Sequence, residues 1–217
     1  MKTSRSIYLI TLVCLISNCV FSQTDNLTDR KTKLANIYSG LGIGVCNSGA
    51  GVSVDGTFIL SNNWGASIRY NPNYLSAKNL PNDYVDLVLF VPFLTNGLPT
   101  DDIVVLTINA VKEFPTGLKL IRFGIEFGPS LVFAKVEEFT PVENPLFPFF
   151  GSNYEVTHDK RNTVGFSLRG KIEFPLTRFA GLQVLLHTNL NSIRSVFGGE
   201  FGVILGLVRE HNRRSSF

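Results

Sequence analysis

Apolar and polar side chains alternate along most of the chain. In the stretch NTVGFSLRGKIEF, residues 162–174, Phe166 and Leu168 alternate with Ser167 and Arg169. A side-chain period of two residues is typical of β-strands. Segments of this kind, separated by turn sequences, predict an all-β chain of eight strands. The predicted strands cover residues 36–46, 51–60, 64–71, 101–114, 119–136, 162–174, 180–190 and 196–208. Residues 101–114 alternate poorly, so the pattern does not assign their two faces.

The charged face of these strands is predicted to point inward. A soluble sandwich buries its apolar face, whereas a membrane barrel turns that face to lipid and encloses the charges. Glycine, serine and alanine are frequent on the non-apolar faces, which fits the narrow interior of an eight-stranded barrel. On a lipid-facing surface each arginine or lysine would cost about 2–4 kcal/mol. The predicted interior charge network, four acids against four bases, consists of Asp55, Arg69, Arg122, Glu126, Arg169, Lys171, Glu173 and Glu200.

The lengths of the strands and of their connections favour the same architecture. Strands of about 11 residues, tilted by about 40°, rise about 28 Å, enough to cross an apolar band of about 25 Å. The second, fourth and sixth connections are the tight turns SNNW, PTGL and PLTR, whereas residues 72–100 and 137–161 form long connections. Short periplasmic turns and long external loops alternate in this way in outer-membrane barrels. The sequence therefore predicts an eight-stranded antiparallel up-and-down transmembrane β-barrel.

The N-terminus has the pattern of a secretory signal peptide. Lys2 and Arg5 precede the apolar run IYLITLVCLI and then SNCVFSQ. We expect a signal peptide at 1–23, a lead-in at 24–35, the barrel at 36–208 and a basic periplasmic tail at 209–217. Cleavage before Cys19, as in a lipoprotein, is an alternative. After cleavage near residue 23, 18 basic residues face 17 acidic ones, and this balance does not indicate nucleic-acid binding.

Several short motifs resemble one known group of proteins. These are the GLGIGV first strand, the NNWGASIRY hairpin, IEFGPSL, FPLTRFAGL and FGVILGLV. Together they look like the small outer-membrane β-barrel proteins of Bacteroidota-type bacteria, within the broad OmpA/OmpX-like group. The resemblance covers nearly the whole mature chain. It implies location in the outer membrane of a Gram-negative bacterium, with no cofactor. One departure is that Phe217 is separated from the last strand by REHNRRSS.

The resemblance also admits an enzyme that acts on lipid A at the outer rim, with a histidine, a serine and an acid. His187 is the histidine on a predicted strand, with Asn189 near it and Ser195 across the next turn. Catalysis needs a nucleophile and an orienting group in contact with the histidine, and the pattern indicates neither contact. We expect His187 to be a hydrogen-bonded interior residue, and we expect no enzyme. His158 and His211 are predicted in a loop and in the tail, without metal-ligand spacing.

The two long connections carry unexplained apolar side chains. Their predicted external contact surface consists of Val85, Leu87, Leu89, Phe90, Phe93, Phe147, Phe149 and Phe150. Exposed apolar surface usually marks a contact; the alternative is that these residues pack on their own barrel. The leading hypothesis is a non-enzymatic, monomeric barrel in contact with outer-membrane lipid, with a structural or surface-binding role toward an extracellular partner of unknown identity. A rim-acting lipid A hydrolase or acyltransferase and a secreted β-sandwich or lipocalin-like binder are the alternatives.

Overall fold

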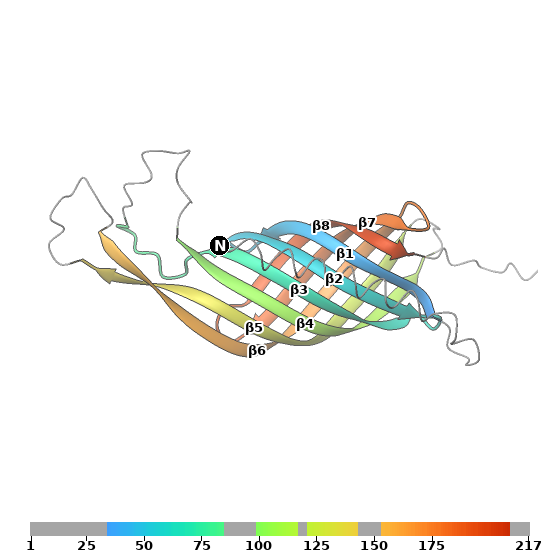
Figure 1. Ribbon diagram of the computed structural model, residues 1–217, viewed down its shortest axis with the longest axis horizontal. Helices are drawn as coiled ribbons and strands as arrows, with labels where there is room; N and C mark the ends of the chain where they lie inside the picture. The colour runs from blue at the N-terminus through green and yellow to red at the C-terminus, as the bar shows by residue number, and fades with distance from the viewer. Residues whose placement is uncertain (1–33, 85–98, 117–120, 143–152, 209–217) are drawn as a thin grey trace, which may run out of the picture.

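The computed structural model of the 217-residue chain describes residues 34–84, 99–116, 121–142 and 153–208. Eight antiparallel strands close into a barrel in sequence order (Figure 1). The strands are β1 (Leu34–Cys46), β2 (Gly49–Leu60), β3 (Trp64–Ser76), β4 (Thr100–Pro115), β5 (Arg122–Pro141), β6 (Tyr154–Pro175), β7 (Ala180–Asn191) and β8 (Val196–Leu207). The predicted eight-stranded antiparallel up-and-down barrel is confirmed, and the alternative prediction of a two-layer β-sandwich is wrong.

Pairing between the first and last strands closes the ring. β1 pairs with β8 from Ile37 opposite Leu207 to Cys46 opposite Gly198. Closure leaves no open edge along the wall, and this is the condition for a β-sheet to cross a membrane. The first strand begins at Leu34, slightly before the predicted start of the barrel. The predicted signal peptide and tail lie outside the described residues.

The two ends of the barrel differ in their connections. The connections after β1, β3, β5 and β7 lie at one end, called here the loop end. The start of β1, the end of β8 and the connections after β2, β4 and β6 lie at the other, called here the terminal end. The tight turn after β2 contains Asn63 at a φ of 64°, a left-handed conformation that asparagine tolerates better than most residues.

β5 and β6 extend beyond their predicted ends. Residues 137–161 are expected from the sequence to form a long connection, yet β5 and β6 stay paired up to Pro141 opposite Tyr154. β7 pairs with β6 only between Gly165 and Pro175, so the far part of β6 extends beyond its neighbour. Figure 1 shows the two strands projecting together past the loop end. Residues 137–141 with 154–161 are called here the ribbon. His158 therefore lies on a strand, and its predicted place in a loop is wrong.

β3 continues through Pro72, although the sequence pattern places the third connection from this residue onward. Proline cannot donate a backbone hydrogen bond and usually interrupts a ladder. The ladder with β2 is indeed interrupted near Pro72, between the pairs Gly51–Asn73 and Val54–Tyr70. The side-chain amide of Asn71 donates to the Val52 carbonyl at 3.0 Å in this gap. A neighbouring side chain thus satisfies the carbonyl that faces the gap, and the strand runs on to Ser76.

Side chains alternate between the interior and the outside on every strand. The outward face is apolar, with large exposed side chains on all eight strands. Examples are Ile43, Val52, Ile68, Ile108, Phe127, Leu168, Leu186 and Phe201. The interior holds buried polar and charged side chains in its middle section. The polar residues of β4, such as Thr107 and Asn109, also point inward, which assigns the faces that its sequence pattern leaves open.

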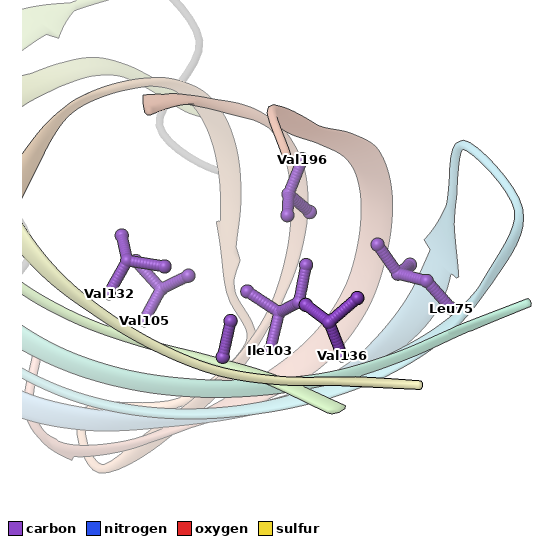
Figure 2. Packing of buried hydrophobic residues seen from close by; sticks show 7 residues of the cluster. Leu75, Ile103, Val105, Val132, Val136 and Val196 are labelled. Carbon is purple, nitrogen blue, oxygen red and sulfur yellow. The ribbon is translucent and has the colours of Figure 1, made fainter. Parts of the chain in front are cut away.

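Apolar side chains fill both ends of the interior. At the loop end, Leu75, Ile103, Val105, Val132, Ala134, Val136 and Val196 form one buried cluster, called here the loop-end plug. Figure 2 shows these side chains converging inside the ring of strands. At the terminal end, Tyr38, Ile59, Val111, Ile204 and Val208 form a second cluster, called here the terminal-end plug. The polar section between the plugs is called here the middle layer.

Candidate functional site: the barrel interior and the ribbon

Glu200 on β8 is the centre of the first group of polar contacts in the middle layer. It forms an ion pair with Arg69 on β3. Its carboxylate also accepts hydrogen bonds from Ser53 Oγ at 2.6 Å and from Asn71 Nδ2 at 3.2 Å. His187 Nδ1 on β7 lies 3.2 Å from the same carboxylate. Side chains from three other strands, β2, β3 and β7, therefore surround one buried acid, whose lost hydration a lone ion pair would not replace.

Glu126 on β5 is the centre of the second group. Its carboxylate forms an ion pair with Arg169 on β6 and accepts a hydrogen bond from Ser67 Oγ at 2.7 Å. Lys171 Nζ lies 3.2 Å from the other carboxylate oxygen. Asp55 Oδ1 lies 4.0 Å from Arg169 Nη1 and links this group to β2. Glu126 is thus shared by two basic side chains.

Lys171 connects the second group to a third, next to the terminal-end plug. Its Nζ lies 2.8 Å from Glu173 Oε1 and donates to the Tyr38 hydroxyl at 2.5 Å. That hydroxyl donates in turn to Glu173 at 2.5 Å, and Glu113 Oε1 lies 3.4 Å from it. Arg122 is half-buried at the start of β5, in register with Glu173. The chain of contacts therefore continues to the terminal end.

The sequence pattern missed an interior acid near the terminal end. Glu113 is buried on the inner face of β4. Among the described residues, the middle layer and the terminal end of the interior thus hold Asp55, Glu113, Glu126, Glu173 and Glu200 together with Arg69, Arg122, Arg169 and Lys171, while the buried Asp101 lies at the loop end. The predicted balance of four against four becomes an excess of one acid. A signal was present, because Glu113 shares its sequence parity with Thr107 and Asn109, which also point inward.

The arrangement around His187 does not fit a serine hydrolase. In such sites a hydroxyl contacts the imidazole and the acid orients the imidazole from its far side. Here the Ser53 hydroxyl donates to Glu200, so the acid lies between the hydroxyl and the imidazole. Asn189 donates to Ser130 Oγ at 2.7 Å, and Ser195 lies in the exposed turn before β8.

A second polar cluster holds the loop end together. Arg194, in the turn after β7, lies 2.7 Å from Asp101 Oδ2 on β4. The same guanidinium donates to the Ser76 carbonyl at 2.7 Å and to Ser48 Oγ at 2.5 Å. Asp101 also accepts from the backbone N–H of Glu137 at 3.1 Å. The Arg194 guanidinium therefore joins the first and seventh connections to the loop-end residues of β3 and β4.

The two long connections meet at the tip of the ribbon. Asn153 Nδ2 donates to the Asp83 carbonyl at 2.6 Å, and the Tyr154 hydroxyl donates to Asp83 Oδ1 at 2.8 Å. The Tyr84 ring packs edge-on against Phe139, with ring centroids 5.5 Å apart. Asp83 and Tyr84 of the third connection thus form one contact cluster with Phe139, Asn153 and Tyr154 beside the fifth connection, called here the tip cluster.

Three side chains of the ribbon have shifted pKa values. The hydrogen bond to Asp83 raises the pKa of Tyr154, and the hydrogen bond to Asp159 raises that of Arg161. Burial raises the pKa of Glu137, which lies 3.9 Å from His158 Nδ1. These shifts follow from local hydrogen bonds and burial at the ribbon.

The predicted external contact surface is not placed by the structure. Val85, Leu87, Leu89, Phe90, Phe93, Phe147, Phe149 and Phe150 lie outside the described residues. Within the described part of the chain, no group of three or more histidine, cysteine or acidic side chains is arranged to hold a metal ion. The same part of the chain contains no helix long and apolar enough to cross a membrane.

Comparison with known proteins supports the fold through structure only. No protein-family model and no curated protein matches the sequence. A major outer membrane protein from Thermus thermophilus is similar in structure, with a TM-score of 0.54 and 12% identity over 79% of this chain and 99% of that one. Neisserial surface protein A gives a TM-score of 0.50 and 10% identity over 78% of this chain and 95% of that one. Likeness at this identity shows the barrel fold alone.

Proposed function

We propose that the chain is a non-enzymatic, monomeric outer-membrane β-barrel of a Gram-negative bacterium, with a structural or surface-binding role. The observation that carries this proposal is the distribution of side chains between the two faces of the wall. Charged residues are buried in the interior, while large apolar residues are exposed around the whole outside. A lipocalin-like soluble barrel has the opposite arrangement, because its outer face meets water.

The same facing supports placement in a lipid bilayer. Exposed apolar side chains on every strand would form an aggregating surface in water. In lipid they replace contacts with water by contacts with acyl chains, and the closed ladder satisfies the backbone hydrogen bonds. The resemblance to Bacteroidota-type barrels, together with the signal-peptide pattern, supports the proposal of export to the outer membrane, with the loop end outside.

The interior supports a barrel that does not conduct solutes. Eight strands leave a bore that side chains fill. Here the middle layer is linked by ion pairs, and an apolar plug closes each end. Any binding of an extracellular partner is therefore assigned to the loop end. The tip cluster supports the idea that the two long connections act there as one unit, because Asp83 and Tyr84 contact residues on both sides of the fifth connection.

A pair of arginine substitutions tests the membrane placement. Leu168 and Val142 are exposed to a similar degree, 47% and 41%, but Leu168 lies on the wall and Val142 just beyond the end of β5. We expect Leu168→Arg to destabilise the barrel in lipid vesicles by about 2–4 kcal/mol. Val142→Arg should change the free energy of unfolding by less than about 0.5 kcal/mol. The measurement is urea unfolding in vesicles, followed by the heat-dependent shift in gel migration.

Equal, small effects of both substitutions would show that Leu168 does not face lipid and would contradict the proposal. Fractionation of the natural protein provides an independent check. A protein recovered only in the soluble fraction of a producing cell would contradict the membrane assignment together with the lipid A enzyme alternative.

A further inference from the structure

The outside of the terminal end is basic. Among the described residues there, Lys112 and Arg178 carry the charges that reach the surface, whereas Glu113 and Glu173 are buried in the interior. The loop end is different, because acids accompany its bases. Arg161, for example, pairs with both Asp159 and Glu138. The two ends of the barrel therefore present different charge to their surroundings.

Lys112 and Arg178 each lie over an exposed aromatic ring. Lys112 on β4 is opposite Trp64 on β3, and its Nζ is 4.8 Å from the ring centroid. Arg178, in the turn after β6, lies 5.6 Å from the Phe179 ring centroid. Trp64 and Phe179 are 45% and 59% exposed. Aromatic rings flank the apolar band of a membrane barrel at headgroup level, so both cations are located where lipid phosphates would lie.

The sequence adds further bases to segments that join this end. The stretch that leads into β1 contains Arg30, Lys31 and Lys33, and the stretch between β4 and β5 contains Lys119. The segment after Val208 contains Arg209, Arg213 and Arg214. The acids in these three segments are Asp25, Asp29 and Glu210. The connection that leaves the loop end after β5 contributes the acid Glu143 instead. The charges in the sequence of these segments and the described side chains thus both indicate that the terminal end is more basic than the loop end.

We propose that the rim of the terminal end binds anionic phospholipid headgroups, with Lys112 and Arg178 as phosphate-binding side chains. The inference rests on the proposed membrane location and adds a lipid preference to it. An ammonium or guanidinium near an anionic membrane surface attracts it over a Debye length, about 10 Å at 0.1 M salt. The neighbouring ring holds the cation at the level of the headgroups while the ring itself contacts the acyl chains.

Trp64 provides a direct test because it is the single tryptophan of the chain and contacts Lys112. The folded protein is placed in phosphatidylcholine vesicles that contain a brominated lipid, which quenches tryptophan on contact. Brominated phosphatidylglycerol and brominated phosphatidylcholine are compared at equal mole fraction. We expect the site to prefer phosphatidylglycerol by about fivefold, the amount that one basic side chain contributes near an anionic surface. High salt should reduce this preference.

Matched variants locate the effect. Lys112→Gln should make quenching by the two lipids equal, whereas Lys135→Gln, at the loop end, should leave the preference unchanged. Trp64→Phe combined with Phe179→Trp moves the reporter beside Arg178, where the same preference is expected. Equal quenching of the natural protein by both lipids would assign the basic rim to another partner or to none and would overturn the proposal. Failure to fold into either kind of vesicle would instead contradict the proposed membrane location.

Discussion

The middle layer and the two plugs fill the same narrow bore with different chemistry. The plugs bury apolar side chains, which stabilises the barrel through the hydrophobic effect. The middle layer buries ion pairs, whose attraction is largely offset by the loss of hydration. The buried charges therefore contribute little net stability. Their removal one at a time is nevertheless costly, because each loss leaves a partner buried without compensation.

The middle layer also affects strand register. A shift of one residue in the pairing of a strand moves its side chains to the opposite face. Such a shift of β6 would move Arg169 and Lys171 into lipid, at about 2–4 kcal/mol each. The same shift would only move the apolar side chains of a plug from one apolar environment, the interior, to another, the lipid. We therefore expect the middle layer to select the register and the plugs to supply stability.

The largest effect that separates the two regions is expected for Glu126→Ala. This change leaves Arg169 and Lys171 without their shared carboxylate in the interior. We expect a loss of about 3–5 kcal/mol in the free energy of unfolding, as for other broken buried pairs. Urea unfolding in lipid vesicles measures this loss.

Glu138→Ala is the matched control, since Glu138 also pairs with an arginine but on the ribbon, where both side chains are 51% exposed. Loss of an exposed pair costs about 1 kcal/mol or less. If the two substitutions had the same effect, the middle layer would not be acting as a dehydrated interior.

Most of the barrel was predictable from the sequence because its wall obeys one simple rule. Where apolar and polar residues alternate strictly, as from Phe166 to Glu173, the pattern gives both the strand and its facing. β4 does not obey the rule, because Ile103 and Val105 fill the loop-end plug while residues on its outer face are apolar too. An apolar interior and an apolar exterior look alike in sequence, so the plugs and Glu113 were missed.

The ribbon was missed for a different reason. Its residues, such as His158 and Arg161, are polar on both faces because the ribbon projects beyond the barrel. Such a strand lacks the alternation that burial on one face imposes, and it resembles a loop in sequence. The prediction that β3 ends before Pro72 was wrong for a related reason. The hydrogen bond from Asn71 to the Val52 carbonyl, which supports the strand next to the proline, depends on tertiary structure.

An intermediate effect is expected when a plug is weakened by Ile103→Ala. Ile103 is fully buried in the loop-end plug, so the shortened side chain leaves a cavity. We expect a loss of about 2–4 kcal/mol in the free energy of unfolding. Ile108→Ala on the outer face of the same strand should cost less, because lipid can fill the space.

Ion conductance of the Ile103→Ala barrel tests which part of the interior closes the bore. We expect none in planar bilayers, because the middle layer and the terminal-end plug still close the bore. A steady current through this variant would show that the loop-end plug alone seals the interior.

The smallest effect is expected for His187→Ala, at the edge of the middle layer. Glu200 keeps its ion pair with Arg69 and its hydrogen bonds from Ser53 and Asn71 when the imidazole is removed. The free energy of unfolding should therefore fall by about 1 kcal/mol, the usual size for a single substitution that breaks no ion pair. The lipid A profile of a producing strain should stay unchanged, because the buried imidazole contacts the acid and the acid separates it from the hydroxyl. Mass spectrometry of extracted lipid A makes this measurement, with a strain that produces the natural protein as the reference. A profile that changed with His187→Ala while the barrel remained folded would favour the rim-acting enzyme over the non-enzymatic barrel.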